Sequence, residues 1–110
     1  MKLGMLLTTS SENQNSEIVF KLANIALSAG HEVDLFFMDD GVYNVVAKNK
    51  ISPKFSELLA KGASLSLCGH TAEERGIDKE DCLEGVQYAG QYELACMVQE
   101  TDRFLMFGGK

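Results

Sequence analysis

The thiol of Cys68 is the side chain in this sequence whose type and position best suit chemistry. It closes the apolar run 63–67, and the stretch 69–76 after it reads as a tight turn and a helix start. In parallel α/β sheets, ligands bind at the edge where the carboxyl ends of the strands meet. A thiolate at that edge is placed to act as a nucleophile. The alternative is a small buried hydrophobe, the usual state of a free cysteine.

Three features beside Cys68 could favour its thiolate form. The pattern Thr71-x-x-Glu74 predicts a capping box, and hence a helix that begins just beyond the thiol and directs its N–H groups and positive dipole end toward it. His70 could donate a hydrogen bond, and Arg75 could supply charge if the helix turns it inward. For His70, a solvated surface position is the alternative.

Tyr43 and Asn44 follow the second predicted strand, at the same edge as Cys68, and are candidates for the lining of its pocket. The alternative for both is a turn, because the residues 39–41, Asp-Asp-Gly, favour one. No cluster of histidines or carboxylates accompanies this acidic pair. We therefore expect a solvated turn here and no metal site.

The remaining thiols belong to Cys82 and Cys96. Three cysteines without a C-x-x-C pair fit neither a disulfide framework nor a zinc site. Cys82 lies in an acidic segment, where carboxylates disfavour a thiolate, so packing is expected and a resolving thiol is the alternative. Cys96 lies in an apolar part of the last predicted helix and is expected in the core. Whether either assists Cys68 stays open.

Strands and helices alternate along the chain. Apolar runs predict strands at 3–7, 33–38, 63–68, 86–88 and 104–107. This alternation predicts an α/β fold with three layers (α/β/α) and a mainly parallel sheet of about five strands, formed by residues 1–110 as a single domain.

Helices are predicted between these strands. The first begins near residues 9–14 and ends at Gly30. The second has Ser52 as its N-cap and runs from Pro53 to Lys61. A helical turn is assigned within 41–50, and a last helix precedes the final strand. The residues expected to face the core are Ile18, Leu22, Ile25, Ala26 and Ala29 in the first helix, Phe55, Leu58 and Leu59 in the second, and Tyr92, Ala95, Cys96 and Val98 in the last.

The composition of the chain limits the classes of binding partner that are expected. The 110 residues include 16 acidic and 10 basic side chains, and the net charge of −6 argues against a broad nucleic-acid surface. No apolar stretch approaches the roughly 20 residues that span a bilayer, and the first residues carry no signal-peptide pattern. We expect a cytoplasmic protein whose partners are proteins or small molecules.

Two other site chemistries fit less well. Low-molecular-weight phosphatases and arsenate reductases need C-x5-R, whereas Cys68 and Arg75 enclose six residues, two of them glutamates that repel an oxyanion. The loop 8–16 has hydroxyls and amides suited to phosphate at a helix N-terminus. However, neither a G-x-G-x-x-G nor a P-loop pattern accompanies it.

Successive blocks of the chain resemble the DsrE/TusD sulfur-relay family. They are Asp40-Gly41-Val42-Tyr43-Asn44, Leu65-Ser66-Leu67-Cys68 with Arg75-Gly76-Ile77 downstream, Glu84-Gly85-Val86, and Thr101-Asp102-Arg103-Phe104. The chain departs from TusD in a shorter connection between the Asn44 block and the third strand, and in Gly69-His70 directly after the cysteine.

This resemblance implies that Cys68 accepts sulfane sulfur as a persulfide and hands it to a partner, with no bound cofactor. It also implies a homotrimer or hexamer, or a hetero-oligomer with DsrF- and DsrH-like subunits, with separate sulfur donor and acceptor proteins. The alternative function is a non-catalytic structural or small-ligand-binding subunit of such an oligomer. The donor, the acceptor and the pathway, whether tRNA thiolation, sulfur oxidation or another, stay open.

Overall fold

A computed structural model describes residues 1–109 and contains one five-stranded sheet. All neighbouring strands are parallel, which confirms the predicted mainly parallel sheet of about five strands. In spatial order the strands are β4 (Gln87–Ala89), β3 (Ser64–Cys68), β2 (Glu32–Phe37), β1 (Lys2–Leu7) and β5 (Arg103–Phe107).

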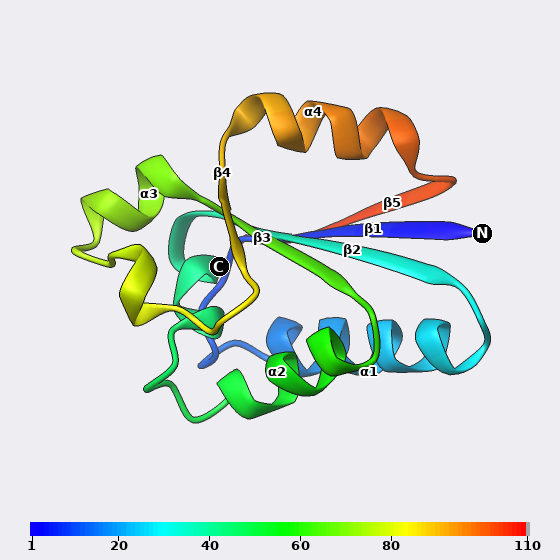
Figure 1. Ribbon diagram of the computed structural model, residues 1–110, viewed down its shortest axis with the longest axis horizontal. Helices are drawn as coiled ribbons and strands as arrows, with labels where there is room; N and C mark the ends of the chain where they lie inside the picture. Colours follow the sequence, from blue (N-terminus) through cyan, green and yellow to red (C-terminus); the bar gives the residue numbers. More distant parts are fainter. Residues whose placement is uncertain (110) are drawn as a thin grey trace.

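Helices cover both faces of the sheet, as the three-layer prediction requires. Helices α1 (Asn15–Ser28) and α2 (Ser52–Ala60) lie on one face, and α4 (Gln91–Glu100) lies on the other (Figure 1). The short α3 (Gly69–Glu74) follows β3 directly. Two 3₁₀ helices complete the chain, η1 (Asp39–Val45), which accounts for the predicted turn within 41–50, and η2 (Lys79–Asp81). None of the helices among residues 1–109 is long and apolar enough to cross a membrane.

Apolar side chains form two cores, one on each face of the sheet. The larger core lies between the sheet and α1 and α2, and takes Met5, Leu35 and Phe37 from the two central strands. The smaller core lies beneath α4 and consists of the buried residues Leu6, Phe36, Cys68 and Met97. Because β1 and β2 are covered on both faces, their sequences are almost continuously apolar. Cys68 belongs to the smaller core and therefore lies on the face of the sheet that α4 covers.

The predicted core stripe of α1 is only partly right: Ala26 is buried and Leu22 packs against the larger core, but Ile18, Ile25 and Ala29 do not belong to the buried face. Ile18 and Ile25 are exposed, whereas the buried positions of the helix are Ser16, Val19, Ala23 and Ala26. The small side chains on this face let the helix lie close to the sheet. Ser16 belongs to the same buried face: its hydroxyl has a single proton, which is shared between Asn44 Oδ1 at 2.7 Å and Ser10 O at 3.2 Å.

The predicted stripe of the last helix is also wrong. Tyr92 and Val98 are exposed, and the buried residue of α4 is Met97. Met97 packs in the smaller core, with Leu94 half-buried one turn earlier. Cys96, expected in the core, is only half-buried. The side of α4 that meets the sheet is thus the one with Leu94 and Met97. The prediction was wrong because it assigned exposed apolar residues of the helix to the core.

Candidate functional site

Strand β3 delivers Cys68 to the carboxyl edge of the sheet. Leu65 and Leu67 point into the larger core, and the pleat turns Cys68 to the opposite face. Cys68 is the last residue of β3 and the N-cap of α3, with an extended backbone at φ −77° and ψ 113°. Its thiol forms no disulfide, and the residue is only 2% exposed.

A close approach to β4 requires glycine immediately after the thiol. A Cβ atom on Gly69 would lie 2.8 Å from a ring carbon of Tyr88. That ring is held in place because the Tyr88 hydroxyl donates a hydrogen bond to Ile77 O. The chain therefore turns tightly from β3 into α3 against the neighbouring strand.

The predicted capping box of α3 is wrong, because the helix begins earlier, at Gly69. Thr71 lies inside the first turn, where its hydroxyl donates back to Cys68 O at 3.2 Å. Glu74 does not reach a backbone N–H and instead lies 3.5 Å from His70 Nε2. The helix nevertheless begins directly at the thiol, as the sequence predicts.

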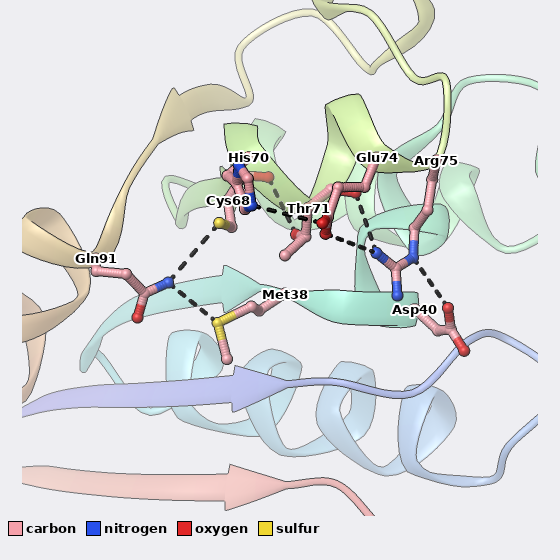
Figure 2. A network of polar contacts seen from close by, with 8 residues as sticks. All are labelled: Met38, Asp40, Cys68, His70, Thr71, Glu74, Arg75 and Gln91. Atoms are coloured by element: carbon pink, nitrogen blue, oxygen red, sulfur yellow. Dashed lines mark hydrogen bonds and ion pairs between the residues drawn. The ribbon is translucent and has the colours of Figure 1, made fainter.

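Gln91 is the polar side chain that reaches the sulfur, and the sequence alone did not identify it. Its Nε2 lies 3.7 Å from Cys68 Sγ and 3.2 Å from Met38 Sδ, between the two sulfur atoms (Figure 2). Gln91 opens α4 just after β4, and Ala89 of β4 pairs with Cys68. The available signal was the Gly90–Gln91 junction, another strand-to-helix connection at the same edge.

His70 and Arg75 have other partners. The His70 side chain is 79% exposed and faces Glu74 across one helical turn. Arg75 Nε donates to Asp40 Oδ1 at 3.0 Å, and its Nη1 donates to Thr71 O at 3.1 Å (Figure 2). Among the described residues, the side-chain hydrogen bond of Cys68 is the one with Gln91. The guanidinium instead ties the end of α3 to η1.

Asn44 and Tyr43 lie apart from the immediate surroundings of the thiol. Asn44 is fully buried, and its Nδ2 donates to Thr9 O and Gly41 O, each at 2.9 Å. Its Oδ1 accepts from Ser16, so every polar atom of the side chain has a partner within the protein. Tyr43 is half-buried and lines a separate shallow pocket with Ser10, Ser11, Glu12, Asp40 and Asn49.

The other two cysteines occupy different environments. Cys82 Sγ lies 3.6 Å from Asp78 O, and burial together with the charge of Asp81 raises the pKa of its thiol. Cys96 lines a groove between α4 and the sheet, alongside Lys2 and Ser66. Neither hydrogen bonds to Cys68 among the residues described. Within residues 1–109, no three His, Cys, Asp or Glu side chains are grouped to hold a metal ion.

Solved structures share this architecture. The chain is similar to the YchN protein of E. coli, with a TM-score of 0.85 over 96% of this chain and 97% of that one at 20% identity. It is also similar to MTH1491 of Methanobacterium thermoautotrophicum, with a TM-score of 0.79 over 94% and 97% of the two chains at 17% identity. At such identities the likeness establishes the fold alone.

Sequence comparisons show to which family the chain is related. The chain is 33% identical to the uncharacterized protein MJ0989 of Methanocaldococcus jannaschii, over 97% of this chain and 100% of that protein. It is 34% identical to the uncharacterized protein MK0008 of Methanopyrus kandleri, over 79% and 77% of the two chains. The DsrE/DsrF-like family matches residues 1–107. The resemblance seen in the sequence is thereby confirmed, and the chain belongs to the DsrE/DsrF-like family.

Proposed function

We propose that the protein carries sulfane sulfur as a persulfide on Cys68 and passes it to an acceptor thiol. Membership of the DsrE/DsrF-like family suggests a role in sulfur relay. The observation that carries the proposal is the position of Cys68, an unpaired thiol at the carboxyl end of β3 where α3 begins. Ligands of parallel α/β folds bind at this edge.

The proposed reaction consists of two thiol exchange steps. The Cys68 thiolate attacks the outer sulfur of a donor persulfide, the donor S–S bond breaks, and its electron pair leaves with the donor thiolate. Cys68 now bears the outer sulfur. An acceptor thiolate then attacks that sulfur, and the new S–S bond breaks to restore the Cys68 thiolate. Each step exchanges one S–S bond for another, so no external oxidant, reductant or cofactor is consumed.

Access to the sulfur requires a side-chain movement. Cys68 is 2% exposed, and the exposed side chain of Gln91 contacts its sulfur. A rotation of Gln91 about its own side-chain bonds would open this contact while the smaller core stays packed. The burial of Cys68 also favours the second candidate function, a non-catalytic subunit in which the thiol only fills space.

Intact-protein mass spectrometry tests the proposal. The reduced chain is treated with a sulfane-sulfur donor, beside Cys68→Ser, Cys82→Ser and Cys96→Ser. We expect a gain of one sulfur that is lost only in Cys68→Ser, with all four chains folded by circular dichroism. A gain that survives in Cys68→Ser, or no gain with any donor, would contradict the proposal.

Alkylation separates a carrier from a structural subunit. A carrier thiol must open to solvent, so iodoacetamide should label Cys68 in the native protein at neutral pH. A thiol that serves only packing should be labelled only at the rate of global unfolding. The dependence of the labelling rate on mild urea distinguishes these two cases, because global unfolding accelerates steeply with denaturant.

We further propose that the chain works in an oligomer, as a homotrimer or hexamer or with DsrF- or DsrH-like subunits. Strand β5 is an edge of the sheet, and its adjacent residues Leu105 and Met106 are exposed. An exposed apolar edge strand favours association. Light scattering on size-exclusion fractions should give a molar mass that is a multiple of the chain mass. The substitution Met106→Lys should lower this molar mass. A monomeric wild-type chain without added subunits would exclude the homo-oligomer.

A further inference from the structure

We propose that Gln91 is a catalytic residue that donates hydrogen bonds to the sulfur atoms on Cys68, first to the thiolate and then to the outer sulfur of the persulfide. The inference deepens the proposed function and rests on it for the second of these steps. Its basis is the position of the Gln91 amide between Cys68 Sγ and Met38 Sδ (Figure 2).

The Gln91 amide group carries two N–H bonds and faces two sulfur atoms. Nε2 lies 3.2 Å from Met38 Sδ and 3.7 Å from Cys68 Sγ. A neutral thiol and a thioether are both weak acceptors, so neither sulfur holds the amide strongly. When Cys68 loses its proton, the same N–H faces a full negative charge, and charge-assisted hydrogen bonds are shorter and stronger than neutral ones.

Met38 marks the place where the amide can bind a second sulfur atom. Its thioether is a weak acceptor, so the Gln91 N–H group that points to it can easily turn to a stronger acceptor. The outer sulfur of a persulfide anion is such an acceptor. It would be bonded to Cys68 Sγ and would therefore lie within reach of the amide that already spans Cys68 and Met38.

No other described polar side chain is in a position to take this role. The remaining neighbours of Cys68 in the smaller core are apolar, among them Phe36 and Met97. His70 faces Glu74, and the Arg75 guanidinium is bonded to Asp40. Without the Gln91 amide, a thiolate in these surroundings would have no side-chain donor among the residues described, and a buried charge that lacks hydrogen-bond donors is strongly disfavoured.

The pH dependence of Cys68 alkylation tests Gln91 directly. In a chain that also carries Cys82→Ser and Cys96→Ser, only Cys68 reacts. Gln91→Met keeps the length of the side chain but removes both donors, and Gln91→Glu replaces them with a carboxylate. Gln87→Glu is the matched control, because Gln87 is an exposed residue of β4 whose side chain forms no hydrogen bond with Cys68.

We expect the midpoint of the alkylation profile to rise by about one pH unit in Gln91→Met, since loss of a charge-assisted hydrogen bond is of that order. It should rise further in Gln91→Glu, because a carboxylate repels the thiolate. Gln87→Glu should retain the wild-type midpoint. If Gln91 only covered the thiol, the maximal rate would change and the midpoint would not, and equal midpoints in all chains would overturn the proposal.

Persulfide lifetime tests the second step. Wild type and Gln91→Met are loaded with a sulfane-sulfur donor, freed of it by gel filtration, and followed by intact mass spectrometry. We expect the outer sulfur to be lost severalfold faster from Gln91→Met. Equal lifetimes, with wild type loading normally, would overturn the role of Gln91 toward the outer sulfur. A wild-type chain that takes up no sulfur would instead overturn the proposed function, while the alkylation midpoints still report on the thiolate.

Discussion

The hydroxyl of Ser16 lies 2.7 Å from Oδ1 of Asn44, and both side chains are completely buried. The same Asn44 side chain donates to Thr9 O and Gly41 O. One amide therefore connects the start of α1, the loop after β1 and the 3₁₀ helix η1. This arrangement holds the carboxyl edge of the two central strands together beside the strand that bears Cys68.

Replacing Asn44 should destabilise the fold severely. In Asn44→Ala, the carbonyls of Thr9 and Gly41 lose their side-chain donor and the Ser16 hydroxyl loses the nearer of its two acceptors, and we expect the free energy of unfolding to fall by about 2–4 kcal/mol. Ser16→Ala should cost about 1–2 kcal/mol. Urea unfolding measures both. The double variant should lose less than the sum of the single losses, and strict additivity would show that the two side chains do not interact.

Gly41 should tolerate no side chain, because the chain passes against the end of β1 there. A Cβ atom would lie 2.0 Å from Leu7 O, a backbone atom that cannot rotate away. We expect Gly41→Ala to lower the free energy of unfolding by about 3 kcal/mol or more, since the backbone must shift.

Gly90→Ala is the control for this substitution. A Cβ atom there would meet only a glutamate side-chain oxygen at 3.5 Å, and its φ of −141° suits any residue. Urea midpoints of the two variants should differ widely. A Gly41→Ala chain as stable as Gly90→Ala would contradict the close approach to Leu7.

Sequence patterns predicted the sheet because its central strands are unambiguous. Residues 3–7 and 33–37 are nearly all apolar, as strands covered on both faces must be. The same reasoning placed Cys68 at the end of β3. It failed in part for the rotation of α1, where periodicity selected the large apolar side chains Ile18 and Ile25. The buried face holds smaller residues and the polar Ser16, which a hydrophobic pattern does not select.

The partner of the thiol was beyond the reach of sequence reasoning for a different reason. Gln91 is 23 residues from Cys68, and they meet only because β4 pairs with β3 and leads directly into α4. Nearby residues such as His70 attracted attention because they adjoin the thiol in sequence. Separation along the chain carries little information about contacts across a sheet edge.

The ion pair between Arg75 and Asp40 should contribute little to stability and should weaken with salt. Arg75 Nε lies 3.0 Å from Asp40 Oδ1, but the Asp40 side chain is 62% exposed. We expect Asp40→Asn to lower the free energy of unfolding by about 0.5–1 kcal/mol at low ionic strength and by less in 1 M salt. Arg75→Ala should cost more, because it also removes the bond to Thr71 O. Equal, salt-independent losses in urea titrations would contradict this ranking.

Cys82 should react slowly with alkylating agents at neutral pH. Burial is the main cause that raises the pKa of its thiol, and the negative charge of Asp81 adds to it. In a chain carrying Cys68→Ser and Cys96→Ser, we expect the alkylation midpoint to lie above that of the same chain in urea. Asp81→Asn should lower the midpoint, because the negative charge is gone, but only in part, because burial still raises the pKa of the thiol. The side-chain oxygen of the new amide can still accept the hydrogen bond from Asp78 N, so the local structure is kept. Glu84→Gln, which removes a charge from the same segment, should leave it unchanged.

The raised pKa of Cys82 also predicts how the free energy of unfolding changes with pH. Because the fold raises the pKa of Cys82, the folded state holds the thiol proton more tightly than the unfolded state does. The contribution of Cys82 is therefore fully present below the ordinary cysteine pKa of about 8.5 and is lost as the pH rises from there through the folded value. Cys82→Ser should remove this part of the alkaline destabilisation, measured by urea unfolding at neutral pH and above about pH 9. An unchanged pH dependence in Cys82→Ser would show that the thiol does not titrate differently in the folded chain.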